Sequence, residues 1–322
     1  MWGNALGWTI SLVIVAITAA ALLLFQRHLA NVTPVTEFAR DAARLGPIAL
    51  PDDPAALLPP ADNFDAGPIY RQAIEVVLAD SDAYEDFATS GRNSERARDL
   101  AALELLRSAA RCAQMSLFTG APDELIRYGR KPELHAIHLA GKSANKLGAL
   151  LTYEKRFDDA IAQHEAAFAL GARLYEERLT LDELLAGLEL MSEAAGGIAA
   201  ASAQAGDEER ARAFSDFRSR YGAYHRSRIQ PLQRVVSSID PGVIAQHSGD
   251  LFYVAQDAQE RMWRIEAILA LGRLRFNAAR LADQRAAERF LERLSQTDPD
   301  PLIRAAATAA RKLTVEKYRM LG

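Results

Sequence analysis

The sequence predicts an all-α protein, and three features of its composition and patterning support that prediction. Alanine and leucine, which lead the helix-propensity scale, account for 61 and 41 of the 322 residues. Valine, isoleucine and threonine, which favour strands, together number only 38. Beyond residue 69 the apolar residues recur at steps of three and four, the period of one helix face. We therefore expect a helical body of about eight to eleven helices with short connections.

The composition also excludes several classes of protein. With 49% apolar and 25% charged residues, the chain is neither disordered nor fully embedded in a membrane. The formal charge of −4 gives no reason to expect a nucleic-acid partner. Because Cys112 is the single cysteine, the chain can form neither an intramolecular disulfide nor a cysteine-based zinc site.

The stretch Ala5–Phe25 is predicted to be a single membrane-spanning helix. Its 21 residues carry no charge, and no Asp, Glu, Lys or Arg precedes Arg27. At about 1.5 Å per residue, such a helix is roughly 31 Å long, close to the hydrocarbon thickness of a bilayer. The alternatives are a cleaved signal peptide, whose basic start is missing, and a buried core helix, whose polar face is missing.

The charges that flank this stretch bear on the side of the membrane that holds the body. Arg27, Arg40 and Arg44 follow it, whereas the short N-terminal tail has only its terminal amine. The positive-inside rule therefore favours a cytoplasmic body. An extracytoplasmic body is the alternative, because many proteins with one N-terminal anchor have that arrangement.

The rest of the chain is punctuated by prolines and then becomes helical. A short juxtamembrane helix is expected at Thr36–Arg44, and Gly46–Pro68 contains six of the 13 prolines. Proline fixes φ and lacks a backbone donor, so Gly46–Pro68 is either an extended stalk or a segment draped over the body. The predicted regions are a membrane anchor (1–28), a juxtamembrane helix and Pro-rich linker (29–68), a helical domain (69–240) and a second helical region (241–322).

Several helix ends are marked by capping residues. Thr180 and Glu183 have the spacing of a capping box, in which a hydroxyl and a carboxylate satisfy reciprocal backbone donors. Gly206–Asp207 is typical of one helix ending and the next beginning. Asp300–Pro301 is typical of an N-cap followed by proline at the first helical position. Further upstream, the apolar stripe of Arg96–Phe118 predicts one continuous helix.

One segment of the body has small residues where the two helices of a hairpin would cross. The matching positions within Leu139–Leu170 are Leu147, Gly148, Phe157, Ala160, Ala167 and Leu170. The segment resembles a tetratricopeptide repeat (TPR), a helix–turn–helix unit of about 34 residues. The resemblance implies that Gly148 and Ala160 allow close helix approach and that Phe157 and Ile161 fill the core. His164 stands where that repeat usually has an aromatic residue.

The C-terminal region contains a match at a separation of 40 residues. Met262–Ala267 aligns with Leu302–Ala307, so that Arg264 matches Arg304. These segments resemble the helices of HEAT repeats, whose period is roughly 40 residues. Both resemblances imply an α-solenoid, in which stacked helix pairs present a long binding surface. An irregular bundle rich in alanine and leucine is the alternative.

Three histidines form the most specific candidate for a catalytic metal site. His135 and His138 are three residues apart on a predicted helix and lie on one face, so they could bind a metal with His164 as a third ligand. The alternative is two polar or half-buried helix residues. Gly141–Ser143 ends like a phosphate-binding loop, but it lacks the glycine five residues upstream and the preceding strand.

Arginines are concentrated between Arg210 and Arg234, with aromatic residues among them. Such a face could bind an anionic partner or lipid headgroups. The acidic net charge of the chain favours the alternative, a basic helix face that pairs with neighbouring acids and covers apolar side chains with arginine stems.

Together these features predict a membrane-anchored helical-repeat protein that mediates protein–protein interaction or scaffolding, with an unidentified protein partner. We expect no catalytic residue and no cofactor. A helical metal-dependent hydrolase that uses His135 and His138 is one alternative, and a structural envelope component is another. The step from solenoid to binding rests on analogy between folds.

Overall fold

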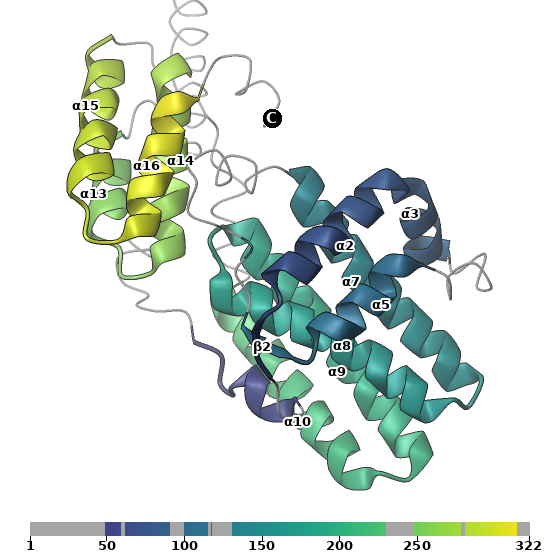
Figure 1. Ribbon diagram of the computed structural model, residues 1–322. Coiled ribbons are helices and arrows are strands. Elements are labelled where there is room, and N and C mark those ends of the chain that lie inside the picture. Colours follow the sequence, from purple (N-terminus) through teal and green to yellow (C-terminus); the bar gives the residue numbers. More distant parts are fainter. Residues whose placement is uncertain are drawn as a thin grey trace, which may run out of the picture.

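The computed structural model describes residues 49–58, 62–90, 100–114, 117, 131–229, 248–277 and 281–313 (Figure 1). Within these residues it has eleven α-helices, so the prediction of an all-α body is confirmed. The predicted anchor Ala5–Phe25 and the predicted helix Thr36–Arg44 lie outside the described residues. In chain order the elements are η1 (Pro54–Leu57), β1 (Asp62–Asp65), α2 (Gly67–Ala79), α3 (Ser81–Ser90), α5 (Ala101–Ala109), β2 (Cys112–Gln114), α7 (Lys131–Tyr153), α8 (Phe157–Glu177), α9 (Leu181–Ala205), α10 (Glu208–Tyr224), the π-helical turn η2 (His225–Ile229), α13 (Ser248–Asp257), α14 (Arg261–Asn277), α15 (Leu281–Thr297) and α16 (Pro301–Lys312).

Two short strands interrupt the helical pattern. β1 and β2 pair in parallel, with Asp62 opposite Cys112 and Asp65 opposite Gln114. The backbone groups of residues 112–114 therefore bond to another part of the chain and not within a helix.

This pairing corrects the prediction of one continuous helix over Arg96–Phe118. Within that range the described helix is α5, which ends at Ala109, three residues before β2 begins. The apolar stripe still identified buried positions, since Leu103 and Leu106 are both buried. Local periodicity thus located the buried face, but it could not anticipate a strand partner about 50 residues away in the sequence.

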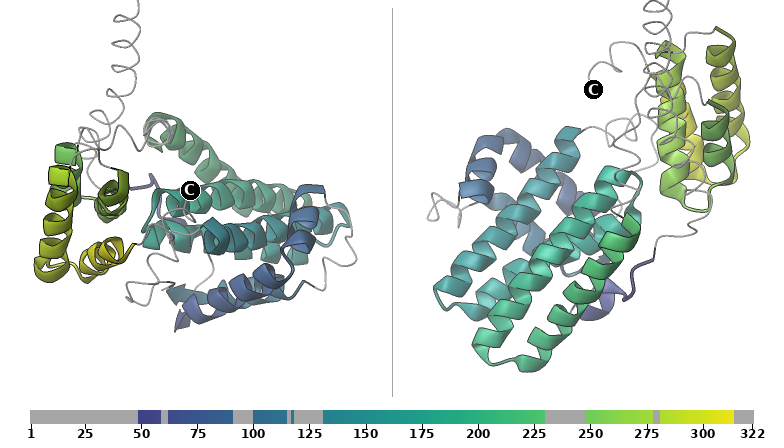
Figure 2. Two further views of the ribbon diagram at one scale, coloured as in Figure 1. Left: turned by 90° about the horizontal axis from the view of Figure 1, so that it is seen from above. Right: turned by 180° about the vertical axis from the view of Figure 1, so that it is seen from behind.

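The larger group of helices, α2 to α10, packs largely in sequence order (Figure 2). α7 packs against α8, α8 against α9, and α9 against α10, while α2, α3 and α5 cover the other side of α7. At the crossing of α8 and α9, a Cβ on Gly171 would lie only 2.7 Å from the carbonyl oxygen of Gly187. The two helices can approach this closely because neither has a side chain at the crossing.

Helix α9 is, among the described residues, the one helix long and apolar enough to cross a membrane. Of its most apolar 18-residue window, 56% is buried inside the body. A core helix and a membrane span can share length and composition, and the packing of α9 against α7, α8 and α10 places it in the core.

The capping box predicted at the start of α9 is confirmed for Thr180 but not for Glu183. The hydroxyl of Thr180 accepts a hydrogen bond from the Glu183 N–H at 3.2 Å, as predicted. The carboxylate of Glu183 accepts instead from the Leu179 N–H, at 2.6 Å, one residue earlier than the capping box requires. Both arrangements satisfy backbone donors that no helical carbonyl reaches.

The other two capping predictions are confirmed. Gly206 ends α9 with a φ of +85°, and Asp207 accepts a hydrogen bond from the Arg210 N–H at 3.1 Å to begin α10. Asp300 accepts from the Leu302 N–H at 2.9 Å at the start of α16.

The segment 49–58 lies on the body, so the draped alternative holds for these residues. The Leu50 N–H donates a hydrogen bond of 2.9 Å to the hydroxyl of Tyr175 on α8. The carboxylate of Asp52 lies 2.9 Å from Nε of Arg220 on α10. These contacts hold the segment 49–58, which belongs to the predicted Pro-rich linker, against two helices of the larger group.

Helices α13 to α16 pack mainly on one another and meet the larger group where α14 approaches α9 (Figures 1 and 2). We call this set the C-terminal unit. Trp263, on α14, is completely buried within it. The buried apolar residues of both groups form one connected cluster, so apolar packing continues from one group to the other.

Candidate functional site

A row of charged and polar side chains follows one face of α7. His135 Nε2 lies 3.2 Å from Oε1 of Glu85 on α3. His138 Nε2 lies 3.2 Å from Oε2 of Glu189 on α9, and Lys142 Nζ lies 2.7 Å from its Oε1. The spacings of three and four residues put all three α7 side chains on one helix face. We call these five residues the α7 row.

Glu189 is the electrostatic centre of the α7 row. The neighbouring imidazole of His138 and then the ammonium group of Lys142 lower its pKa to about 2. The hydrogen bond to Glu189 raises the pKa of Lys142 in turn. The Glu189 side chain is 44% exposed, so water screens the pair and its strength is modest.

His164 lies in a different environment. Its ring is wedged between two glycines, because a Cβ on Gly148 would lie 2.6 Å from its Nε2 and a Cβ on Gly197 would lie 2.2 Å from its Cε1. Nδ1 lies 3.0 Å from Oδ1 of Asn145. Burial lowers the pKa of His164 to about 4, so the imidazole is neutral at physiological pH.

The three histidines therefore have three different sets of neighbours. His164 packs beside Asn145 and Gly148, which lie roughly 10–15 Å along α7 from His138 at 1.5 Å per residue. Within the described residues, no three His, Cys, Asp or Glu side chains are grouped so that they could hold a metal ion. In the TPR resemblance, position 164 usually holds an aromatic residue that packs in the core. The His164 ring has that packing role, since it lies between Gly148 and Gly197.

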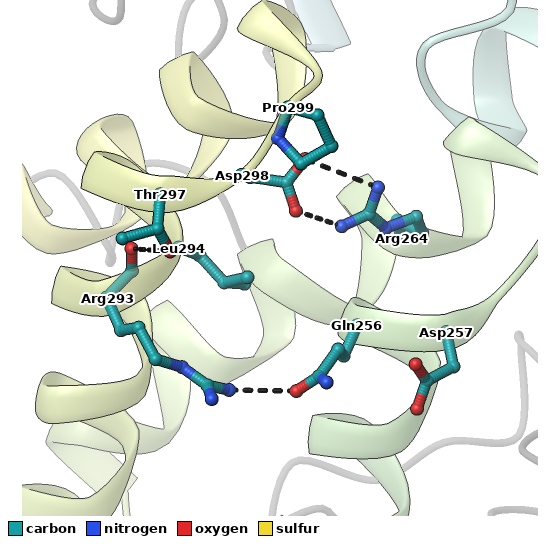
Figure 3. Close-up of a pocket in the computed structure, with 8 residues that line it drawn as sticks. All are labelled: Gln256, Asp257, Arg264, Arg293, Leu294, Thr297, Asp298 and Pro299. Carbon is teal, nitrogen blue, oxygen red and sulfur yellow. Dashed lines mark hydrogen bonds and ion pairs between the residues drawn. The ribbon is translucent and has the colours of Figure 1, made fainter.

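A pocket of about 350 Å³ opens where the ends of α13 and α15 meet α14 (Figure 3). The Arg264 guanidinium binds the carboxylate of Asp298 through both terminal nitrogens, and its Nε donates to the Ala255 carbonyl at 2.9 Å. Arg293 donates to the side-chain oxygen of Gln256 at 2.8 Å. The lining residues are Gln256, Asp257, Arg264, Arg293, Leu294, Thr297, Asp298 and Pro299.

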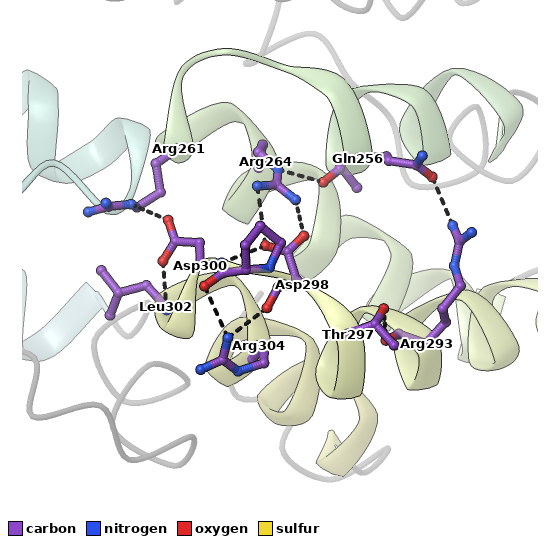
Figure 4. A network of polar contacts seen from close by, with 11 residues as sticks. Gln256, Arg261, Arg264, Arg293, Thr297, Asp298, Asp300, Leu302 and Arg304 are labelled. Atoms are coloured by element: carbon purple, nitrogen blue, oxygen red, sulfur yellow. Dashed lines mark hydrogen bonds and ion pairs between the residues drawn. The ribbon is translucent and has the colours of Figure 1, made fainter.

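The two arginines that match across 40 residues have equivalent roles in this network (Figure 4). Arg264, on α14, donates to the Ala255 carbonyl near the end of α13. Arg304, on α16, donates to the carbonyls of Asp298 and Pro299, just beyond the end of α15, at 2.6 and 3.1 Å. A cation at a helix C-terminus satisfies carbonyls that lack helical partners. The polar groups of the pocket thus brace helix ends, which is a structural role.

The arginines of α10 are partly paired, as the predicted alternative to anion binding requires. Arg210 forms an ion pair with Glu165 on α8, and Arg220 forms one with Asp52. The aromatic side chains of Phe214 and Phe217 are buried and not available for stacking. Arg234 lies outside the described residues.

The segment Gly141–Ser143 lies in the middle of α7, so it is not a loop. A Cβ on Gly141 would lie 2.7 Å from the side chain of Leu190 on α9, which shows that this glycine serves helix packing. The phosphate-binding alternative therefore lacks the strand and the loop that it needs.

Comparison with known proteins adds no family. No protein-family model, no curated protein and no solved structure matches the chain. The resemblances to TPR and HEAT repeats therefore depend on the residues of this sequence. The α7 row joins side chains from three helices, and all of them except His138, which is 19% exposed, are between 37% and 59% exposed.

Proposed function

We propose that the protein is a membrane-anchored helical scaffold that binds another protein along the α7 row. The order of helix packing carries this proposal. α7 packs against α8 and also against α9, so the first helices of the pairs α7/α8 and α9/α10 are neighbours. This is the relation between successive repeats of an α-solenoid, and it leaves one continuous face for a partner.

The chemistry of the α7 row supports recognition of a charged protein surface. The ion pair of the row joins Lys142, which is 37% exposed, to Glu189, and His135 at one end of the row is 59% exposed. Exposed pairs contribute about 0–1 kcal/mol, so a partner's charged groups can replace them at small cost. Such exchange gives specificity by charge complementarity.

The stretch Ala5–Phe25 is the proposed anchor. The argument for it is its length without charge and the cluster of arginines that follows, which favours a cytoplasmic body. Membrane fractionation tests it: the full-length chain should stay in membranes after an alkaline wash, and a variant without residues 1–28 should not. Recovery of the full-length chain in the aqueous fraction would contradict the anchor.

Site-specific photo-crosslinking in intact membranes tests the scaffold. A photoreactive residue at position 142 should give discrete adducts with another protein, and Glu189→Lys should abolish them by reversing the charge beside it. The matched control is a photoreactive residue at Glu288, which is 55% exposed on α15 of the C-terminal unit. Equal adducts from both positions, or none from position 142, would overturn the proposed binding face.

The two alternative functions give different outcomes of the same tests. A stoichiometric metal in the purified chain, lost in His138→Ala, would support the metal-dependent hydrolase. Membrane retention without any adduct would support a structural envelope component.

A further inference from the structure

The connection between α8 and α9 is a corner at which three parts of the chain meet. It contains Tyr175 near the end of α8, Arg178 in the connection and Leu181 at the start of α9. The C-terminal unit reaches this corner from one side, and the segment 49–58 reaches it from another. We call these three residues the α8–α9 corner.

The C-terminal unit contacts the corner through two carboxylates. Glu260, which precedes α14, accepts a hydrogen bond from Arg178 Nε at 3.1 Å, and its side chain is only 7% exposed. Glu266, on α14, accepts from the Leu181 N–H at 2.8 Å. Leu181 opens α9, where no helical carbonyl can reach that backbone donor. Glu266 therefore satisfies a backbone donor at the start of α9, and Glu260 places a buried carboxylate against the Arg178 guanidinium.

The segment 49–58 contacts the same corner through Tyr175. The tyrosine hydroxyl accepts the hydrogen bond from the Leu50 N–H, and the Arg178 guanidinium lies 4.9 Å from the centre of the tyrosine ring. Arg178 also donates to the Tyr175 carbonyl at 2.8 Å. Leu50, Tyr175, Arg178 and Glu260 thus form one continuous chain of contacts.

The carboxylates of Glu260 and Glu266 have different kinds of hydrogen-bond donor, a charged guanidinium and a neutral backbone N–H. Glu260 faces a guanidinium, so removal of Arg178 would take away the positive charge that faces this buried carboxylate. Burial raises the pKa of Glu266, while the Leu181 N–H lowers it. A neutral amide oxygen at position 266 would therefore keep the hydrogen bond and avoid the cost of a buried charge.

We propose that the α8–α9 corner is a latch that docks the C-terminal unit on the larger helical group, and that it couples this docking to the position of the segment 49–58. The coupling runs through Tyr175, which binds Leu50 with its hydroxyl and Arg178 with its ring. Docking and the seating of the segment therefore favour each other, as linkage between two sites requires. The latch does not depend on the proposed scaffold function or on the anchor.

Distance measurements between spin labels test the latch in the full-length chain in detergent micelles. Labels replace the exposed side chains of Tyr153 in the larger group and Glu288 in the C-terminal unit, in a Cys112→Ala background. The reference chain should give one narrow distance distribution. Arg178→Ala and Glu266→Ala should broaden it toward longer distances, whereas Glu266→Gln should keep it narrow.

Tyr175→Phe tests the coupling, since it removes only the hydroxyl that binds Leu50. A lost neutral hydrogen bond changes an equilibrium by about fivefold, so the undocked population should rise by up to about fivefold. The matched control is Glu292→Gln, which breaks an exposed ion pair within the C-terminal unit and should leave the distribution unchanged.

Circular dichroism first establishes that each variant keeps its helical content, and Arg178→Lys replaces Arg178→Ala if the latter unfolds. An unchanged distribution in both Glu266→Ala and the Arg178 variant would overturn the latch. A broadened distribution in those two variants together with an unchanged one in Tyr175→Phe would overturn the coupling.

Discussion

The larger helical group and the C-terminal unit pack their helices by different means. In the larger group, glycines let helices come close: Gly171 meets Gly187 at the crossing of α8 and α9, and two further glycines enclose His164. In the C-terminal unit, arginines tie helix ends together. Arg264 and Arg304 bind carbonyls at the ends of α13 and α15, and Arg275 binds the carbonyl of Ala310 near the end of α16 at 3.3 Å.

The two packing modes predict different sensitivities to substitution in the two regions. Where helix backbones touch, an added methyl group has no space, because packed interiors have few voids. Where an arginine satisfies several acceptors at once, removal of its side chain leaves those acceptors without partners. We therefore expect the larger group to be sensitive to added volume and the C-terminal unit to be sensitive to lost arginines.

The largest expected effect is that of Arg264→Ala. It would leave the Asp298 carboxylate, only 6% exposed, without its guanidinium, and breaking such a buried pair costs about 3–5 kcal/mol. The control is Arg261→Ala, because Arg261 is 50% exposed and pairs with Asp300 at the surface. That change should cost about 0–1 kcal/mol in chemical denaturation. Equal losses in the two variants would contradict the bracing role of Arg264.

His164 should make the larger group sensitive to acid. Its pKa falls from 6.5 to about 4 on burial, so the unfolded chain binds the proton more tightly than the folded chain does. The contribution of neutral His164 to the free energy of unfolding is fully present above pH 6.5 and is lost as the pH falls toward 4. The loss is about 1.4 kcal/mol per pH unit, or roughly 3 kcal/mol in all.

Denaturation of the wild-type chain and of His164→Phe between pH 7.5 and 4 measures this contribution. Phenylalanine keeps a flat ring between the two glycines and removes the titrating group. The variant should show a shallower loss of stability with falling pH. Parallel curves would mean that His164 is not the group responsible.

Gly171→Ala should have the next largest effect. The added Cβ would meet the Gly187 carbonyl oxygen at 2.7 Å and the Met191 backbone nitrogen at 2.9 Å, and these backbone atoms cannot rotate away. Overpacking costs about 1–3 kcal/mol, only partly offset by the higher helix propensity of alanine. Gly222→Ala is the matched control, since its nearest neighbour is the flexible end of Arg226 at 3.5 Å. The melting temperature of Gly171→Ala should be well below that of Gly222→Ala. A higher melting temperature for Gly171→Ala would contradict the close crossing of α8 and α9.

The smallest expected effects are those of the helix caps. Thr180→Ala and Asp300→Ala each remove one side-chain acceptor from a helix N-terminus, in the larger group and in the C-terminal unit respectively. Each should cost about 1 kcal/mol of unfolding free energy. A much larger loss for Asp300→Ala would show that its pairing with Arg261 matters more than the cap.

Local sequence predicted which α7 residues of the candidate site share a face, but not the residues of other helices that contact them. The spacing of His135 and His138 correctly placed both on one face of α7, because that relation depends on helix geometry alone. Their partners, Glu85 and Glu189, lie about 50 residues away on other helices, and no local pattern names them. The glycine that completes the slot for His164, Gly197, was missed because a glycine inside a helix carries no sign of what packs against it.

The helical class, the helix ends at Thr180, Gly206 and Asp300, and the buried face of α5 follow from local sequence, because they depend on neighbours within a turn or two of the chain. The packed fold was needed to show that β2 follows α5, that Arg264 and Arg304 bind carbonyls at helix ends, and that Glu266 accepts a hydrogen bond from the first residue of α9. Those contacts join residues distant in sequence, and their energies depend on burial that exists only once the helices have packed.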